Sequence, residues 1–207
     1  DAACNPRNEP VVREVLSVCR SHQLPIVPML VNYANGWQAD RLHRLLINRA
    51  RHREFAESLL ALLRKHQFQG VNIDFESVSP ADRDNLTHLV TQIHAVLNPA
   101  GLVVCQDVQA VPLDDPESYA FDLHALSQVN DFIVVMAYDQ HEEDHEAGPI
   151  CGIDWLEKQW RFAIDRVTPD RLVLAIGCYA YDWREGKAPA TDLTYQGALT
   201  QCADNYD

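Results

Sequence analysis

The sequence lacks a long apolar run, and it has few basic residues for its size. No run approaches the roughly 20 apolar residues that a membrane-spanning helix needs. No targeting signal can be read in the first residues, Asp1 to Cys4, which lack a basic and then an apolar segment. Lys and Arg number 17 against 30 Asp and Glu, for a net charge of −13. Because such a charge repels polyphosphates, we expect no nucleic-acid partner.

The six cysteines form no CxxC pair, and this spacing excludes a zinc ribbon. Cys105 and Cys178 lie in apolar runs, so we expect them to be buried free thiols. In an oxidising compartment two pairs could form disulfides, Cys4 with Cys19 or Cys151 with Cys202. The even number of cysteines does not decide between these alternatives.

Five apolar segments are typical of buried parallel strands, each bounded by turn-forming residues. They are residues 24–33, 70–76, 102–111, 132–138 and 171–178. Amphipathic patterns predict helices over residues 9–22, 40–66, 80–97, 122–128 and 154–167, and another from 194 onward. The clearest helix start is Ser79 followed by Pro80, an N-cap hydroxyl and then a proline in the first turn.

This alternation predicts a single α/β domain with a parallel sheet, either open or closed. A length of 207 residues, 47% of them hydrophobic, suits such a domain, and there is no repeat or linker. In both forms of the sheet, functional groups belong at the carboxyl ends of the strands.

Residues 70–76, GVNIDFE, place three polar side chains on an otherwise apolar strand. Alternate side chains point to opposite faces, so Asn72, Asp74 and Glu76 share one face. The Cα atoms of the two acidic residues would lie about 6.6 Å apart, close enough for each charge to shift the other's pKa. A carboxylic acid kept protonated beside an ionised one can cleave a glycosidic bond. The alternative is a strand end with solvated carboxylates, since a DxE pair alone is a weak signal.

Three further strand ends carry polar or aromatic residues. The first strand ends near Asn32, and the fourth ends with Met136 and Tyr138 on one face and Asp139 at the mouth. The fifth leads into residues 177–183, GCYAYDW, whose rings suit stacking against sugars. One aromatic residue at a strand end usually reflects packing. Three successive strand ends with such residues favour a binding or catalytic site.

Together these segments resemble the family 18 glycoside hydrolases, the chitinase-like (β/α)8 TIM barrels. The family's signature strand runs DGxDxDxE, and residues 69–76, QGVNIDFE, match it with the first two aspartates replaced. MAYD at residues 136–139 is similar to the sixth-strand motif, and residues 173–183 to the seventh strand and its exit. The resemblance covers roughly residues 9–200.

Within the family, the sequence resembles two groups most. One comprises spore-cortex and peptidoglycan N-acetylglucosaminidases. The other, which we favour, is the barrel domain of bacterial proteins that also contain a polysaccharide deacetylase and a glycosyltransferase. The resemblance implies an extracytoplasmic enzyme that acts on a polymer containing N-acetylglucosamine, with other domains of a larger fusion protein as possible partners. The sequence does not choose among chitin, peptidoglycan and exopolysaccharide.

The resemblance also implies roles for individual residues. Glu76 would be the general acid and then the base, and Asp74 would orient the substrate's 2-acetamido group. Tyr138 would hydrogen-bond that group's carbonyl as it attacks C1, giving an oxazoline and retained configuration. This chemistry needs no enzyme nucleophile, cofactor or metal. The substrate-binding residues would be Asn72, Met136, Asp139, Asn32, Tyr179 and Trp183.

The sequence departs from the family pattern in three ways. Asn72 cannot titrate, so we expect Asp74 to lose a like-charge neighbour and to ionise more readily. Gln69 replaces an aspartate, and we interpret its role as mainly structural. The first strand resembles the family's third, and the chain ends where the eighth would begin. We therefore expect a partial barrel over residues 1–207, with two exposed sheet edges.

Three other functions fit parts of the sequence. Residues 141–145, HEEDH, fit the zinc-peptidase pattern HExxH, but they follow a strand directly and precede Gly148 and Pro149. We therefore expect an acidic loop over the pocket mouth. A carbohydrate-binding barrel without catalysis is supported by Asn72 and by the short chain, whereas Glu76 argues against it. A purely structural domain leaves the polar face of residues 70–76 unexplained.

Overall fold

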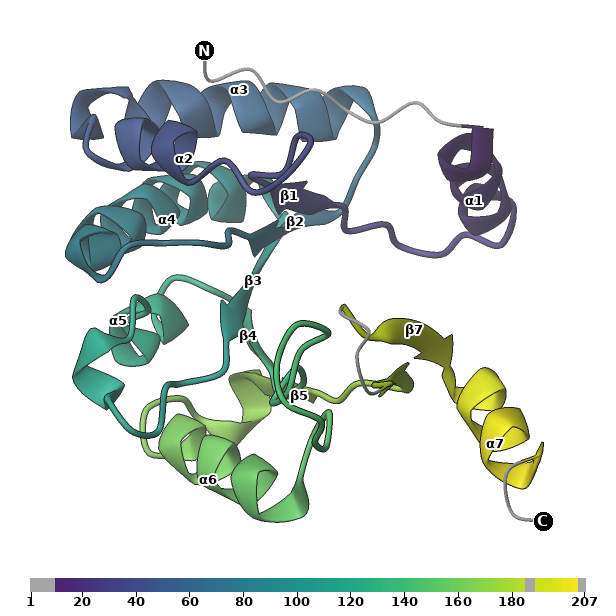
Figure 1. The fold of residues 1–207 in the computed structure, drawn as a ribbon. Helices are drawn as coiled ribbons and strands as arrows, with labels where there is room; N and C mark the ends of the chain where they lie inside the picture. Colours follow the sequence, from purple (N-terminus) through teal and green to yellow (C-terminus); the bar gives the residue numbers. More distant parts are fainter. Residues whose placement is uncertain (1–9, 185–188, 205–207) are drawn as a thin grey trace.

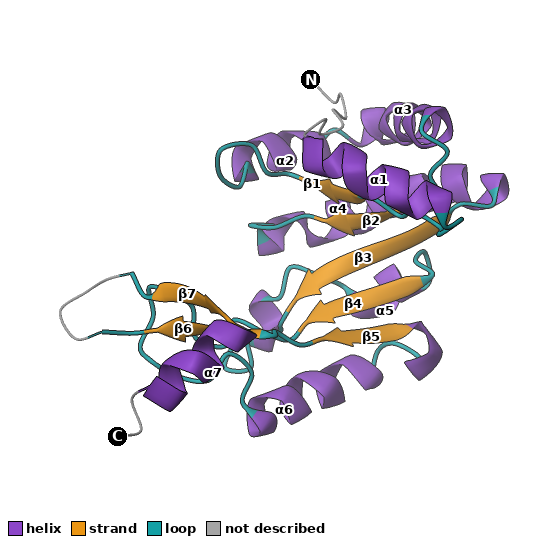
Figure 2. Ribbon diagram, turned by 90° about the vertical axis from the view of Figure 1, so that its right-hand side faces the viewer, coloured by secondary structure: helices purple, strands orange, loops and turns teal. Residues whose placement is uncertain are grey.

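The computed structural model describes residues 10–184 and 189–204. Its centre is a parallel sheet whose spatial order, β1-β2-β3-β4-β5, is the order along the chain (Figure 2). The strands are β1 (Met29–Val31), β2 (Gly70–Asp74), β3 (Val103–Gln109), β4 (Phe132–Met136) and β5 (Leu172–Ala175). The α/β fold with five parallel strands is thus confirmed, and it is that of a segment of a TIM barrel.

Helices alternate with these strands. They are α1 (Pro10–Ser21), α2 (Ala39–Leu46), α3 (His52–Lys65), α4 (Arg83–Leu97), α5 (Leu123–Ser127), α6 (Ile153–Ile164) and α7 (Tyr195–Asp204). Helices α3, α4, α5 and α6 lie along one side of the sheet, with α2 beside α3 (Figure 1). None of the described helices combines the length and apolar character that crossing a bilayer requires.

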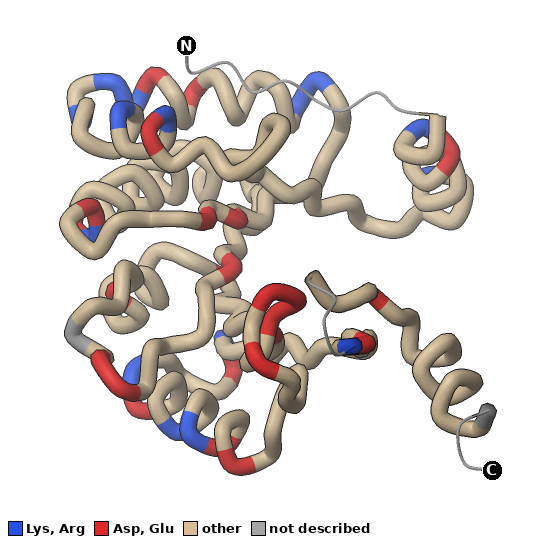
Figure 3. The backbone as a smooth tube through the Cα atoms, viewed as in Figure 1, with Lys and Arg blue, Asp and Glu red and all other residues tan. Residues whose placement is uncertain are grey.

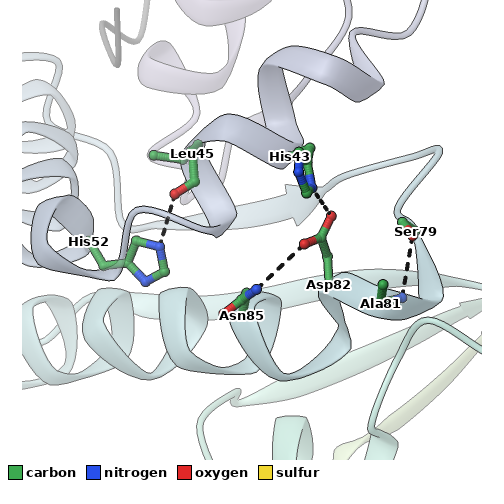
Figure 4. A network of polar contacts seen from close by, with 7 residues as sticks. All are labelled: His43, Leu45, His52, Ser79, Ala81, Asp82 and Asn85. Atoms are coloured by element: carbon green, nitrogen blue, oxygen red, sulfur yellow. Dashed lines mark hydrogen bonds and ion pairs between the residues drawn. The ribbon is translucent and has the colours of Figure 1, made fainter.

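The single helix expected over residues 40–66 is wrong, because the chain forms α2, a 3-10 turn at Arg49–Arg51, and then α3. Asn48 leaves the helical conformation, with φ −94° and ψ 67°. The buried ring of His52 donates from Nε2 to the carbonyl oxygen of Leu45, near the C-terminal end of α2, at 3.1 Å (Figure 4). This buried hydrogen bond lies beside the break between α2 and α3, and the pattern of apolar residues does not reveal it.

A second polar contact joins α2 to the start of α4. The ring of His43 donates to Asp82 at 2.7 Å, and Asp82 is buried at the junction (Figure 4). The hydroxyl of Ser79 accepts from the backbone N–H of Ala81 at 3.3 Å, which confirms the predicted N-cap with Pro80 in the first turn. That first turn is 3-10 and continues into α4.

The apolar face of β2 packs on the helices. Val71, Ile73 and Phe75 belong to one buried cluster with apolar side chains of α3 and α4. Gln69 ties β2 to the segment before β1, because its Oε1 accepts from the N–H of Ile26 at 2.7 Å. This contact supports a structural role for Gln69. Burial of the apolar face leaves Asn72 and Asp74 on the opposite face, as the alternation predicts.

The first and fifth strands are shorter than expected. Pro25 and Pro28 have no N–H for a strand ladder, and β1 begins only at Met29. The strands β1 and β5 are the edges of the sheet, and neither pairs on its outer side with another strand of the described residues.

An antiparallel hairpin, which the sequence did not indicate, follows the sheet. It consists of β6 (Tyr179–Asp182) and β7 (Thr191–Thr194), and α7 follows it as expected. We expected residues 177–183 to continue directly from the fifth strand. Strand β5 instead ends at Ala175, and residues 179–182 form the first strand of the hairpin.

The cysteines differ in part from expectation. Cys151 and Cys202 are free thiols, so the disulfide considered for them is not formed. The expectation of a buried Cys178 is wrong, because this residue lies beyond the end of β5 and is exposed. Cys105 is a half-buried free thiol, and Cys4 lies outside the described residues.

The buried face of α4 predicts a stability difference between two isoleucines. Ile93 is 0% exposed, whereas Ile153, at the start of α6, is 76% exposed. We expect Ile93→Ala to lower the free energy of unfolding by about 2–5 kcal/mol, because it leaves a cavity. The matched control, Ile153→Ala, should change it by less than about 0.5 kcal/mol. Urea denaturation followed by circular dichroism measures both, and equal effects would contradict this packing.

Candidate active site

The candidate site lies where the polar faces of β2 and β3 meet the residues after β4. Asp74 is 6% exposed, and Glu76, two residues further on, is half-buried. Burial raises the pKa of the Glu76 carboxyl, and the charge of Asp74 raises it further. Gln109 on β3 donates from Nε2 to Glu76 Oε2 at 3.4 Å, which acts in the opposite direction. The two acidic residues therefore interact as the alternation on β2 predicts.

Asp107 on β3 is a part of the site that sequence reasoning missed. Asn72 donates from Nδ2 to Asp107 Oδ2 at 2.7 Å, so the two side chains bridge β2 and β3. Asp107 is 7% exposed. Its pKa is raised to about 6, chiefly by burial and also by the charge of Asp74, while the hydrogen bond from Asn72 acts in the opposite direction. The signal was available in residues 106–109, QDVQ, where Asp107 and Gln109 alternate on an apolar strand just as Asp74 and Glu76 do.

Burial changes the expectation for Asp74. We expected Asp74 to ionise more readily because Asn72 removes a like-charge neighbour, but burial raises the pKa of Asp74. The charge of Asp74 in turn raises the pKa of Asp107 on the neighbouring strand. A second carboxyl group is thus present beside Asp74, on β3.

Tyr138, two residues beyond β4, is half-buried beside these acids. The pKa of its phenol is raised to about 12, chiefly by burial and also by the charges of Asp107 and Asp74. Asp139 and Glu76 contribute in the same direction. The phenol is therefore protonated at neutral pH and can donate a hydrogen bond. Met136, the last residue of β4, is half-buried and pairs with Gln109 in the strand register.

Asn32, directly after β1, holds the backbone of Glu76. Its Nδ2 donates to the carbonyl oxygen of Glu76 at 2.9 Å, and its Oδ1 accepts from the Glu76 N–H at 2.9 Å. Both the oxygen and the nitrogen of the Asn32 amide are therefore hydrogen-bonded to the Glu76 backbone. Binding of a substrate by Asn32 stays a prediction. The next residue, Ser77, has φ +56°, so the chain turns away directly after Glu76.

Aromatic rings lead outward from Tyr138 along the hairpin. Tyr138 and Tyr179 meet edge to face with ring centroids 6.3 Å apart, and the hydroxyl of Tyr179 donates to Asp139. The ring of Tyr181 follows at 5.6 Å from Tyr179, and that of Trp183 at 5.5 Å from Tyr181. The structure thus brings Asp139 and Tyr179 to the site, whereas Trp183 lies two ring contacts further out.

Residues 141–145 form a loop, as expected, and not the helix that an HExxH zinc site needs. The ring of His141 hydrogen-bonds the carbonyl oxygen of Glu146 at 2.9 Å. Three side chains, Glu142, Asp144 and His145, place possible ligand atoms within 4.8 Å of one another, but all three are exposed. Trp183 donates from Nε1 to the carbonyl oxygen of His145 at 3.1 Å, which links this acidic loop to the hairpin.

Comparison with known proteins identifies the family. The family model described as glycosyl hydrolases family 18 matches residues 28–206. The chain belongs to this family. It is 26% identical over 174 residues to the "uncharacterized glycosylase YvbX" of Bacillus subtilis, with 81% of this chain and 51% of the relative covered. It is 25% identical to the "cortical fragment-lytic enzyme" of Bacillus anthracis, with 84% and 42% covered.

A solved chitinase structure shows the same arrangement of strands and helices. The "chitinase from Chromobacterium violaceum" superposes with a TM-score of 0.88 at 26% identity, covering 98% of this chain and 65% of that one. Our chain spans about half the length of the curated relatives it matches. The name of the cortical fragment-lytic enzyme agrees with the spore-cortex group, the first of the two groups that the sequence resembles. Membership of the fusion group stays a prediction.

The two hydrogen bonds from Asn32 to the Glu76 backbone, which we call the clamp, can be tested without assuming an activity. Asn32→Ala removes the acceptor for the Glu76 N–H and a donor to its carbonyl, two bonds of about 1 kcal/mol each. We expect hydrogen exchange of the Glu76 amide, followed by NMR, to become at least about tenfold faster. The control is Asn85→Ala, which removes a side-chain amide of α4 that hydrogen-bonds Asp82. It should leave the exchange of the Glu76 amide unchanged. Unchanged exchange in Asn32→Ala would contradict the clamp.

Burial of Asp107 predicts a pH-dependent gain in stability when its charge is removed. Its folded pKa, about 6, lies above the ordinary 3.8. The protonated form is therefore favoured by folding, and this contribution is lost as the pH rises through 6. We expect Asp107→Asn to raise the free energy of unfolding at pH 8 relative to pH 4, by roughly 1–3 kcal/mol.

Urea denaturation at a series of pH values measures this gain. The matched control is Asp170→Asn, at an exposed carboxylate before β5, which should show no such rise between pH 4 and pH 8. An equal gain at both pH values in Asp107→Asn would contradict the proposed cause, since removal of a buried charge acts only where that charge is present.

Proposed function

We propose that this chain carries the acid/base site of a glycosidase that cleaves β-linked N-acetylglucosamine polymers with help from the substrate's own acetamido group. The observation that supports this most is the convergence of Asp74, Glu76 and Tyr138 at the carboxyl ends of β2 and β4, in a chain of family 18. A cofactor is not required for this reaction.

Glu76 is the proposed general acid. Burial and the charge of Asp74 raise its pKa, so a larger fraction of the carboxyl stays protonated near neutral pH and can protonate the glycosidic oxygen. The resulting carboxylate then takes a proton from the water that opens the intermediate. Asn32 fixes the Glu76 backbone while Gln109 contacts its carboxyl, which limits the positions that the acid can occupy.

Asp74 and Tyr138 act on the acetamido group in this proposal. The acetamido oxygen attacks C1 as the leaving group departs, which gives a positively charged oxazolinium and inverts C1. The carboxylate of Asp74 orients the acetamido N–H and stabilises the positive charge. The phenol of Tyr138, with a pKa of about 12, donates to the acetamido oxygen. Attack by water inverts C1 again, so the configuration is retained.

The remaining residues shape the pocket for the sugar. Met136 and Asp139 lie at the end of β4, and the hydroxyl of Tyr179 holds the carboxylate of Asp139. The rings of Tyr179 and Trp183 offer surfaces for further sugar units. Asn72 and Asn32 act chiefly by holding other residues of the site, since their amides are bonded to Asp107 and to the Glu76 backbone.

The relatives support the substrate class but leave its identity open. A chitinase and a cortical fragment-lytic enzyme suggest chitin or peptidoglycan, and a secreted exopolysaccharide is a third possibility. These polymers lie outside the cytoplasm, so we propose an extracytoplasmic location. We also propose that further strands close the sheet at β1 and β5 into a barrel, and that the active protein has other domains as partners.

The decisive measurement is hydrolysis of N-acetylglucosamine oligomers by this chain and by a version with the complete barrel, with the product anomer followed by NMR. We expect the complete barrel to release the β-anomer, and Glu76→Gln to lower its kcat roughly 100-fold or more. Activity of the complete barrel alone would show that the short chain is an incomplete site.

The matched control is Glu157→Gln, at an exposed glutamate on α6 that pairs with Arg161, and its kcat should equal that of the unmodified protein. Binding of the oligomers by the complete barrel without any cleavage would overturn the proposal. That result would instead favour the carbohydrate-binding barrel.

A further inference from the structure

Two buried carboxyl groups flank Asn72, one on each of two neighbouring strands. Asp74 lies two residues along β2, and Asp107 on β3 accepts the hydrogen bond from Asn72. Their exposures, 6% and 7%, are nearly equal. The charge of Asp74 raises the pKa of Asp107. Because like charges on neighbouring strands disfavour each other, we expect the two groups to titrate as a pair.

The hydrogen bonds around this pair are incomplete in a way that a shared proton would remedy. Asn72 Oδ1 and Asp74 Oδ1 are buried acceptors without a donor in the described part of the chain. Buried acceptors without donors are costly. A protonated carboxyl group is a donor, so one proton held by the pair can satisfy one of these oxygens.

Besides the amide of Asn72, three titratable groups interact electrostatically with Asp107. They are Asp74 on β2, Cys105 on the same strand, and Tyr138 after β4. Of the carboxylates that act on the Tyr138 phenol, Asp107 has the largest effect, followed by Asp74. Asp107 therefore lies within electrostatic reach of both groups that the proposed function places on the acetamido group.

We propose that Asp107 is a positioning residue of the site: from β3 it supplies the second carboxyl group that the β2 motif lacks at Asn72, and it sets the ionisation of Asp74. Only the effect of Asp107 on catalysis rests on the proposed function. The pairing of the two carboxyl groups is a property of the free protein. Asn72 acts as the bridge, since its amide joins Asp107 to the strand that carries Asp74.

A purely structural role for Asp107 makes a different prediction. An acceptor that only fixes Asn72 could be replaced by the isosteric asparagine, whose Oδ1 accepts the same hydrogen bond. Such a change would leave the titration of Asp74 where it is. A like-charge neighbour cannot be replaced in this way, because asparagine carries no charge at any pH.

The test follows the Asp74 carboxyl carbon by NMR as a function of pH, in the full chain without substrate. In Asp107→Asn we expect the midpoint for Asp74 to fall by about one pH unit, because the like charge is gone. The exchange variant Asn72→Asp with Asp107→Asn returns a second carboxyl group to the pair, and the midpoint should rise again. The control Asp131→Asn, at the opposite end of the sheet where Asp131 accepts from the Val104 N–H, should not move it.

The same variants then give the acid limb of the pH profile for hydrolysis by the complete barrel. We expect this limb to fall in Asp107→Asn and to return in the exchange variant, in step with the NMR midpoint. An unmoved Asp74 midpoint in folded Asp107→Asn overturns the proposal, whether or not the protein cleaves oligomers. Lack of cleavage by the unmodified complete barrel, with a shifted midpoint, refutes only the proposed function.

Loss of folding in Asp107→Asn would leave two decisive measurements. In the unmodified protein, the Asp107 carboxyl carbon should show a second inflection at the Asp74 midpoint, and a single-step curve for each residue would overturn the pairing. Asn72→Asp alone adds a third carboxyl group and should raise the Asp74 midpoint. No change there would contradict the inference as well.

Discussion

The hydrogen bond between Asn72 and Asp107 joins β2 and β3 at the level where both strands change from apolar to polar. Further along the chain lie Asp74, the last residue of β2, then Glu76 just beyond the strand, and Gln109 on β3 contacts Glu76. The two strands therefore hold each other's polar residues through side chains as well as through the backbone ladder. Every acid proposed for the chemistry depends on this parallel register, which pairs Asn72 with Cys105.

The register in turn depends on the apolar face of the sheet. Val71, Ile73 and Phe75 pack into the cluster formed with α3 and α4, and a slip of one residue would turn these side chains away from the helices. Such a slip would also bury Asn72, Asp74 and Glu76 against apolar helices, where unpaired carboxylates are strongly disfavoured. Packing on one face thus positions the acids on the other.

The sequence was sufficient for features that depend on one segment and insufficient for those that depend on two. The period-2 alternation of β2 and the N-cap at Ser79 are local, and both were predicted. The contact between Asn72 and Asp107 requires the register of two strands, which no single segment encodes. The break between α2 and α3, with the buried bond from His52 to Leu45 beside it, and the pairing of β6 with β7 each involve two segments.

Glu76 illustrates how a residue beyond the end of a strand can still be fixed. The strand β2 ends at Asp74, so Glu76 has no place in the ladder, and Ser77 turns the chain away with a positive φ. The Asn32 side chain takes the place of a neighbouring strand, because its amide accepts from the Glu76 N–H and donates to the Glu76 carbonyl oxygen. The general acid proposed here is therefore held by strand β1 through Asn32 and by strand β3 through Gln109. An acid at a loop position is thus placed by the sheet, which is the condition for a short, well-aimed proton transfer.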